Sequence, residues 1–297
     1  MFISRNKVIG LLIVCVIIIS AFFVYLKFNK NVPEEIIVPS PSVEEISVQP
    51  KYKIIGKSFE GRSIESFTFG EGKTHLLFIG GIHGGYEWNS IILAYQFIDY
   101  LNQNPAIVPK NLSISIIPNA NPDGAYKFIG KEGRFSIVDI PQEKNTTGLG
   151  RFNARNVDLN RNFDCRWSAD TTWRENKVGA GTAPFSEPES QAIRDFVLVE
   201  KPTAVISWHS QSNTVYAGEC GTGIIPETME IMNLYAQSSG YQTATTFDAY
   251  VITGDMEGWL TTIGIPSITV ELKTHETIEW EQNLAGIKSL INYYSVK

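Results

Sequence analysis

The chain has 297 residues and carries 25 basic against 31 acidic side chains, so its formal net charge is −6. A protein that binds nucleic acid normally presents a basic face, and this balance therefore argues against a nucleic-acid partner. The length is sufficient for one large domain with a sizeable core.

The N-terminal region begins with a short tail, residues 1–7, followed by an uncharged apolar run at residues 8–26. At a helical rise of about 1.5 Å per residue the run would extend roughly 28 Å, close to the thickness of the hydrocarbon core of a bilayer. The run therefore predicts a transmembrane helix that acts as a signal anchor. A cleaved signal peptide is the alternative, and it would make the protein secreted.

The charges that flank this run bear on the location of the protein. Two basic residues precede it and two follow it closely, so the positive-inside bias only slightly favours a cytoplasmic N-terminus. We therefore expect a single-pass protein of the cell membrane, with the rest of the chain outside the cytoplasm. Membrane contact would then be made through the N-terminal helix.

Residues 27–50 predict a flexible stalk. This segment is rich in proline and contains the acidic pairs Glu34-Glu35 and Glu44-Glu45. Such a composition buries too little apolar surface to fold by itself. Residues 51–297 contain neither an internal repeat nor a second linker, and they predict one large domain.

Within the domain, apolar runs that are typical of buried strands alternate with segments of helical periodicity. The strand-like runs are residues 75–81, 111–118, 203–208 and 266–272. The helical segments are residues 87–101, 186–199, 226–240 and 277–294, with Ser186 as the expected N-cap of the second. This order predicts a three-layer α/β/α domain around a mostly parallel mixed sheet.

Three polar residues fall at or near the ends of these strands, where sites gather in such sheets. His83 follows the first strand and His209 the third, while Glu271 lies near the end of the fourth. Glu87 opens the first helix, and the glycines at 84 and 85 would allow its carboxylate to approach the His83 ring. Two imidazoles and one carboxylate make a three-ligand catalytic zinc site, and a further glutamate supplies the base that its water needs.

Each of these residues also has an ordinary structural interpretation. A single histidine at a strand end is often part of a satisfied core. Glu271 could form a salt bridge with Lys273, two residues later. The combination of the polar residues at several strand ends favours the metal site.

Only two cysteines, Cys165 and Cys220, lie in the predicted domain. In an exported protein an even pair of cysteines is typical of a disulfide. A disulfide here would connect the Asp-Cys-Arg-Trp segment to the Gly-Glu-Cys-Gly segment. Two free thiols are the alternative.

Five segments together resemble the M14 zinc carboxypeptidases, the carboxypeptidase A-like family, in their order and separations. They are GGIHGGYEW, IPNANPDG, RFNARNVDLNRNF, SWHS and SITVEL. The resemblance covers about residues 51–297. It implies that His83, Glu87 and His209 bind one Zn²⁺ per chain, with a fourth position left open for water. It also implies that Asp158 orients His83 through the second ring nitrogen.

The resemblance assigns further roles to the site. Glu271 would take a proton from the attacking water and return it to the leaving amine. Arg151 would polarise the scissile carbonyl, with Arg155 in the same loop as the alternative. The remaining substrate-binding residues would be Asn160 and Arg161, which bind the C-terminal carboxylate, and Tyr250, which covers the substrate.

Two features go beyond the motif. The usual first motif is His-x-x-Glu, whereas three residues separate His83 from Glu87 here, so the glycine turn must absorb one extra residue. Glu257 stands two residues before Trp259, at a position that lines the floor of the specificity pocket in the family. With Asp255 nearby, it predicts a preference for a basic or amino-bearing C-terminal residue, although a solvated acidic loop would give the same sequence.

The resulting hypothesis is a zinc-dependent metallocarboxypeptidase that hydrolyses the C-terminal peptide bond of peptides. One alternative keeps the metal and changes the substrate to cell-wall peptides with γ-D-glutamyl-diaminopimelate bonds. Another is a pseudo-enzyme that binds peptide C-termini without cutting them.

Overall fold

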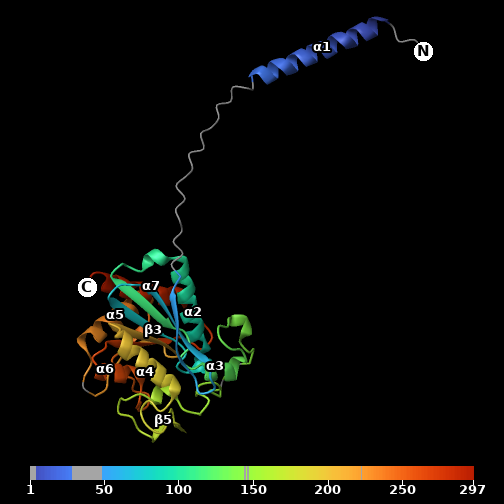
Figure 1. Ribbon diagram of the computed structural model, residues 1–297. Helices are drawn as coiled ribbons and strands as arrows, with labels where there is room; N and C mark the ends of the chain where they lie inside the picture. Colours follow the sequence, from blue (N-terminus) through green and yellow to red (C-terminus); the bar gives the residue numbers. More distant parts are fainter. Residues whose placement is uncertain (1–4, 29–48, 144, 146, 222) are drawn as a thin grey trace. The chain divides into compact units, whose positions relative to one another are not determined.

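The computed structural model describes residues 5–28, 49–143, 145, 147–221 and 223–297 (Figure 1). The chain divides into two compact units, Met1–Ile46 and Ser47–Lys297. The predicted stalk at residues 27–50 falls almost entirely outside the described residues.

The described part of the first unit is one helix, α1 (Arg5–Phe28), over the apolar run. Its described side chains from Val16 to Phe28 are largely exposed. None of the described helices combines the length and the apolar character needed to cross a membrane. The predicted transmembrane helix at residues 8–26, and membrane contact through it, are therefore not supported.

The second unit is built on an eight-stranded mixed sheet with the strand order β1-β2-β4-β3-β7-β10-β8-β9. The strands are β1 (Lys51–Lys57), β2 (Ser63–Gly70), β3 (Thr74–Ile79), β4 (Leu112–Ile117), β7 (Ala204–Ser210), β8 (Thr214–Ala217), β9 (Gln242–Ala244) and β10 (Ser267–Leu272). The four central strands, β4, β3, β7 and β10, run parallel. Antiparallel pairing joins β1 to β2, β2 to β4 and β10 to β8, while β8 and β9 pair in parallel.

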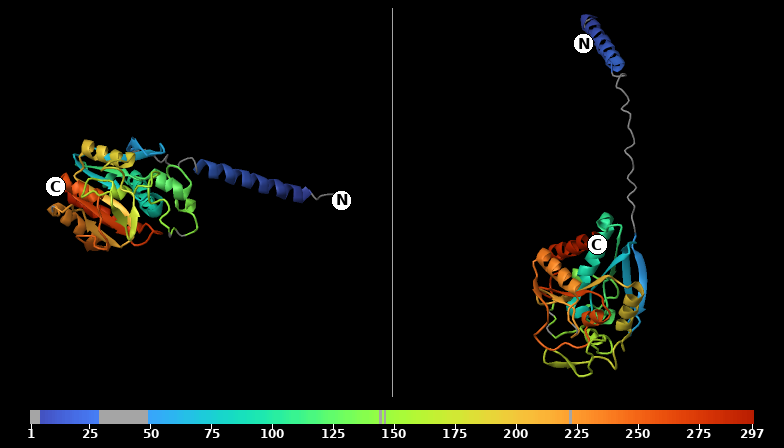
Figure 2. Two further views of the ribbon diagram at one scale, coloured as in Figure 1. Left: turned by 90° about the horizontal axis from the view of Figure 1, so that it is seen from below. Right: turned by 90° about the vertical axis from the view of Figure 1, so that its left-hand side faces the viewer.

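Long helices cover both faces of this sheet, which gives three layers (Figure 2). The helices α2 (Trp88–Gln103), α5 (Pro226–Ser239) and α7 (Trp280–Ser295) belong to one buried cluster, which includes Phe78 and Trp208. The helices α4 (Pro188–Glu200) and α6 (Met256–Thr262) pack on the other face around Leu77 and Val205. The mixed three-layer α/β architecture agrees with the prediction.

The central strands β3, β4 and β7 carry buried apolar residues on both faces because helices cover both of those faces. All residues of β4 and β7 are buried, and so is β3 except for its first residue. The polar Ser207 and His209 lie on the fully buried strand β7, which makes them candidates for a function rather than for solvation.

Two helix boundaries can be compared with the capping residues expected from the sequence. Helix α5 begins at Pro226 and ends before Gly240, which is left-handed as predicted for a C-cap glycine. Helix α4 begins at Pro188, and its N-cap position is Glu187 rather than Ser186. Ser186 is not the cap because its hydroxyl donates to the Glu187 carboxylate instead of receiving a helix N–H.

The remaining elements are short and lie mainly in the connections. They are the hairpin β5 (Thr171–Trp173) and β6 (Asn176–Val178), the helix α3 (Pro122–Ile129), and the 3₁₀ turns η2 (Gly84–Glu87), η3 (Pro105–Ile107), η4 (Ile137–Asp139) and η5 (Leu159–Arg161). Two of these turns, η2 and η5, carry residues that the sequence assigns to the site.

Candidate active site

The carboxyl ends of the central strands bring together three of the predicted residues. His83 lies in the turn after β3, while His209 and Glu271 lie near the ends of β7 and β10. These last two strands are parallel neighbours, and Glu271 is the register partner of His209. The sheet therefore fixes the spacing between a potential ligand and a potential base.

His83, Glu87 and His209 form a buried cluster with the geometry of a metal site. The Nδ1 atom of His83 lies 2.8 Å from Glu87 Oε1 and 3.2 Å from Nδ1 of His209. The same His209 atom lies 3.2 Å from Glu87 Oε2. Ligands about 2.0–2.1 Å from a tetrahedral zinc ion are separated by roughly 3.3 Å. The three side chains therefore fit a zinc ion with only small adjustments.

The glycine turn accommodates the extra residue in the first motif. Gly84 adopts a φ of +46°, and the η2 turn places the Glu87 carboxylate beside the His83 ring. A Cβ on Gly84 would come within 2.6 Å of the Gly150 carbonyl oxygen, and one on Gly85 within 2.5 Å of Phe128 Cβ. Glycine is required at both positions because the neighbouring loops pack directly on the turn.

The electrostatics of the cluster also suit a cation. Burial acts to raise the pKa of Glu87, but the neighbouring His83 and His209 hold it well below its usual value. Burial acts to lower the pKa of His209, yet the Glu87 carboxylate raises it to about 9. A carboxylate that stabilises positive charge on the facing imidazole would stabilise a metal cation in the same place.

Asp158 and Arg151 lie behind His83. The Nε2 atom of His83 is 3.4 Å from Asp158 Oδ1, so the carboxylate stands on the side of the ring opposite Glu87. Arg151 Nη2 lies closer to the same nitrogen, at 2.8 Å, and 2.9 Å from Asp158 Oδ2. Despite burial, the Arg151 charge holds the pKa of Asp158 well below its usual range. Asp158 therefore contacts both side chains and can orient them together.

Of the two candidate arginines, only Arg151 lines the cavity that contains the metal cluster. Its guanidinium carbon lies 4.4 Å from the centre of the Trp173 ring, on the β5–β6 hairpin. Arg155 instead reaches Glu187 and the Phe59 ring. The geometry therefore favours Arg151 over Arg155 as the group that meets a substrate.

Glu271 faces the same cavity and is free of the alternative salt bridge. Lys273 donates through Nζ to Gln282, on α7, rather than to Glu271. Burial, together with the Glu87 carboxylate, raises the pKa of Glu271 to about 8. Two carboxylates that repel each other in a buried site gain stability when a cation lies between them.

The cavity extends beyond the metal cluster and has a volume of about 550 Å³. Asn160, Arg161 and Tyr250 line it. Arg161 is 1% exposed, and three of its N–H groups donate to the carbonyls of Asn160 and Thr172. Its guanidinium has no carboxylate partner within the described part of the chain, and the Tyr250 ring lies 6.0 Å from it. A buried, unneutralised arginine suits an anionic ligand.

A group of carboxylates lines another part of the same cavity. Glu257 is 4% exposed and accepts a hydrogen bond from Ser207, on β7. Burial, with the neighbouring Glu257 charge, raises the pKa of Asp255 to about 6. Asp255 also caps α6 by accepting a hydrogen bond from the Gly258 N–H. This wall of the cavity is suited to a positively charged group.

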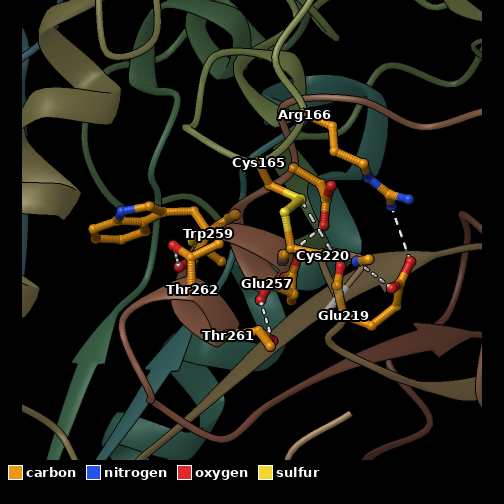
Figure 3. The surroundings of a disulfide bond; sticks show 12 residues. Cys165, Arg166, Glu219, Cys220, Glu257, Trp259, Thr261 and Thr262 are labelled. Atoms are coloured by element: carbon orange, nitrogen blue, oxygen red, sulfur yellow. Dashed lines mark hydrogen bonds and ion pairs between the residues drawn. A yellow bond between two sulfur atoms is a disulfide. The ribbon is translucent and has the colours of Figure 1, made fainter. Parts of the chain in front are cut away.

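A disulfide between Cys165 and Cys220 lies beside the part of the cavity that Glu257 and Asp255 line, which we call the acidic wall (Figure 3). The next residue, Arg166, and the preceding residue, Glu219, form an ion pair at 2.9 Å, and both line the cavity. The sulfur of Cys165 would lie only 2.5 Å from a Cβ on Gly258, so α6 packs directly on the disulfide.

Several residues that contact the metal cluster or line the cavity were not predicted from the sequence. Ser210 donates its backbone N–H to Glu87 Oε2, and its hydroxyl lies 2.7 Å from His275 Nδ1. The Tyr86 ring packs on His275 at 4.5 Å. One signal was available, because His275 is among only four histidines in the chain and lies four residues after Glu271.

Comparison with known proteins agrees with this geometry. The sequence profile of the zinc carboxypeptidases, peptidase family M14, matches residues 44–286. The chain belongs to the M14 zinc carboxypeptidase family. Zinc is the metal of this family, and the cluster of His83, Glu87 and His209 has the donors to hold it.

Among curated relatives of this M14 chain, a γ-D-glutamyl-L-diamino acid endopeptidase of Lysinibacillus sphaericus is 24% identical over 73% of the chain and 59% of the relative. Carboxypeptidase O of Bos taurus is 27% identical over 66% of the chain and 56% of the relative. The chain thus spans little more than half the length of either relative.

Solved structures support the same fold. The thrombin-activatable fibrinolysis inhibitor aligns over 84% of the chain and 70% of its own, with 20% identity and a TM-score of 0.66. The murein-tripeptide amidase MpaA of Escherichia coli O157 aligns over 85% of the chain and 96% of its own, with 22% identity and a TM-score of 0.60.

Proposed function

We propose that this M14 protein is a zinc-dependent metallocarboxypeptidase that hydrolyses the C-terminal peptide bond of peptides. The single observation that carries the proposal is that one cavity contains both a cluster that could hold a metal, with the Glu271 carboxylate beside it, and the buried Arg161, which forms no ion pair among the described residues. The metal cluster and the adjacent carboxylate suit hydrolysis of an amide bond. The arginine suits a peptide end that carries a free carboxylate.

The position of each residue in the cavity suggests its role in the reaction. His83, Glu87 and His209 would hold the zinc ion, which would supply Lewis acidity and lower the pKa of a water molecule. Glu271 accepts the proton of the attacking water and returns it to the departing amine. Arg151 donates to the carbonyl oxygen as negative charge develops there.

Recognition of the chain end falls to the other residues of the cavity. Arg161 has two N–H groups beyond those that donate to backbone carbonyls, and these can bind the terminal carboxylate. Asn160 lies beside it, with its Oδ1 held by the Met256 N–H. Tyr250 covers the bound residue from the loop that precedes α6.

The test is turnover by the purified full-length protein loaded with zinc. We expect release of single C-terminal amino acids from a peptide mixture, measured by mass spectrometry. Glu271→Gln should bind zinc with unchanged stoichiometry and lose about 10²–10⁴-fold in kcat. The control is Glu281→Gln, the same chemical change at an exposed position on α7, which should leave turnover unaltered. Peptide binding without release by the wild type would instead indicate a pseudo-enzyme.

A second candidate is an amidase that cuts cell-wall peptides at γ-D-glutamyl-diamino acid bonds. The acidic wall formed by Glu257 and Asp255 favours it, because a diamino acid carries a second amino group that a carboxylate can bind. Relatives whose names describe such substrates support it as well. Parallel assays of muropeptides and of ordinary peptides ending in lysine separate the two candidates by their kcat/KM values.

We also propose that the catalytic domain works outside the cytoplasm. The Cys165–Cys220 disulfide supports this, because structural disulfides persist in oxidising compartments. Protein taken from its native source in the presence of an alkylating reagent should show both cysteines protected until it is reduced. Alkylation of both cysteines without reduction would contradict the proposal.

A further inference from the structure

His275 lies where the cavity of the metal cluster meets a second cavity. The second cavity has a volume of about 600 Å³, and Trp88 and Phe128 are among the residues that line it. Among the described residues, four line both cavities: Tyr86, Arg174, Gln211 and His275. Arg161 lines only the first cavity. His275 therefore stands between the space proposed for the C-terminal residue and an adjoining space that Arg161 does not line.

A peptide that is cut at the metal cluster has to continue beyond it. With its terminal carboxylate at Arg161, the residues before the scissile bond lead out of the first cavity, and the second cavity offers them an adjoining space. Each of these residues brings a backbone N–H group, which costs free energy when it leaves water without an acceptor. An acceptor at the junction of the two cavities would therefore strengthen substrate binding.

One buried amide holds the loop that carries His275. The Nδ2 atom of Asn89, on α2, donates to the carbonyl oxygens of Thr274 and Thr277 at 2.7 and 2.9 Å. Because these carbonyls can only accept, the other amide atom of Asn89 is the oxygen, and it accepts from the Ser210 hydroxyl at 3.1 Å. The two carbonyls on either side of His275 are thus fixed to a helix of the core.

The same contacts determine which nitrogen of His275 carries the proton. The Ser210 hydroxyl has a single proton and donates it to Asn89 Oδ1. The contact of 2.7 Å between Ser210 Oγ and His275 Nδ1 then requires a proton on Nδ1. Burial lowers the pKa of His275, which favours the neutral ring. In a neutral imidazole with the proton on Nδ1, the Nε2 atom is an acceptor.

This acceptor is available to a ligand. Among the described residues Nε2 has no hydrogen-bond partner, since Nδ1 is the nitrogen that contacts Ser210. The side chain is half-buried, and the Tyr86 ring packs on it with 4.5 Å between the ring centres. The ring is therefore held at one nitrogen and by one aromatic neighbour, which leaves Nε2 as an acceptor of fixed position.

We propose that His275 is a substrate-binding residue whose Nε2 atom accepts a hydrogen bond from a backbone N–H of the peptide on the N-terminal side of the scissile bond. The inference rests on the proposed function and deepens it, because it extends recognition from the terminal residue to the residues before the cut. The ligand is recognised by its main chain, so the contact is independent of the side chain at the C-terminus.

The experiment uses the zinc-loaded full-length protein and three versions of one tetrapeptide. The parent has all its amides, and in each of the other two an ester oxygen replaces the backbone N–H of the first or of the second residue before the scissile bond. Each ester deletes one donor without adding bulk. The wild type should lose about 3–10-fold in kcat/KM on one of the two esters.

His275→Asn should remove that preference, so that its kcat/KM differs less than 2-fold between the parent and the same ester. The shorter amide can still donate to Ser210, and zinc stoichiometry should stay unchanged. His275→Gln is the matched control, because its amide oxygen can lie near the Nε2 position, and it should retain a preference for the parent. A merely structural role would lower kcat/KM on all three peptides by the same factor in His275→Asn, and this result would overturn the inference.

Failure of the proposed function can be recognised separately. If the wild type releases no amino acid from any of the peptides, the proposed function fails, and calorimetry decides the inference. The wild type should then bind the parent about 3–10-fold more tightly than one of the esters, and His275→Asn should abolish the difference. Equal binding of all three peptides by the wild type, or no binding at all, would overturn the inference.

Discussion

Replacing Asp255 by asparagine should stabilise the protein at neutral pH and have little effect in acid. Asp255 lies close to Glu257 in a poorly hydrated wall, and burial with that charge raises its pKa from 3.8 to about 6. The Gly258 N–H and Arg161 act in the opposite direction without cancelling the rise. Asparagine retains an oxygen to cap α6 and removes the charge.

The sign follows from proton binding. Between pH 3.8 and about 6 the folded carboxyl holds a proton more tightly than the unfolded one, so stability falls as the pH rises through this window. The full shift corresponds to about 3 kcal/mol, and partial hydration of the side chain reduces it, so we expect a gain of about 1–3 kcal/mol at pH 7.5.

The assay is urea unfolding of wild type and Asp255→Asn between pH 4 and pH 8. The stability difference should rise with pH and level off above about pH 7. Asp248→Asn, an exposed carboxylate of the same loop, serves as the control and should show no such trend. A difference for Asp255→Asn that is constant across the range, or that falls with pH, would refute the reasoning.

Three further predictions concern the turn, the disulfide and the chain-end arginine. Gly84→Ala should weaken zinc binding, which competition with a chelator can measure. The control is Gly130→Ala, which is also at positive φ but in open space. It should lower the free energy of unfolding by only about 1 kcal/mol and leave the zinc affinity intact. Replacing Cys165 and Cys220 together by serine should lower the free energy of unfolding by up to about 4 kcal/mol, as denaturant titration can check, because the disulfide closes a loop of 55 residues. Arg161→Gln should reduce kcat/KM on peptides with a free C-terminus by at least about 10-fold, while a peptide with an amidated C-terminus, already a poor substrate, should lose little.

Much of the fold could be predicted because its central strands are rich in buried apolar residues and alternate with segments of helical periodicity. The prediction failed where tertiary contacts decide the outcome. The short strands β8 and β9 have three or four residues and acquire their structure by pairing with the sheet edge. Ser186 has the chemistry of a helix cap, but the adjacent Glu187 carboxylate takes its hydroxyl.

In the candidate site, too, some residues could be predicted from the sequence and others depend on tertiary contacts. His83, His209 and Glu271 could be identified from strand ends, since parallel strands bring those ends to one edge. Periodicity could not reveal that Arg151 contacts the His83 ring, because this contact depends on how an irregular loop packs behind the turn.

The register between β7 and β10 has a consequence for how this enzyme can change over evolution. His209 and Glu271 are locked as neighbours by backbone pairing, while Asn160, Tyr250 and Glu257 come from turns or from the start of a short helix. Of the residues proposed for bond cleavage, His209 and Glu271 thus lie on an inflexible scaffold, while those proposed for substrate selection lie on segments that tolerate insertions and exchange. Grafting the stretch between β8 and β10 from one relative onto another should therefore transfer preference without dismantling hydrolysis.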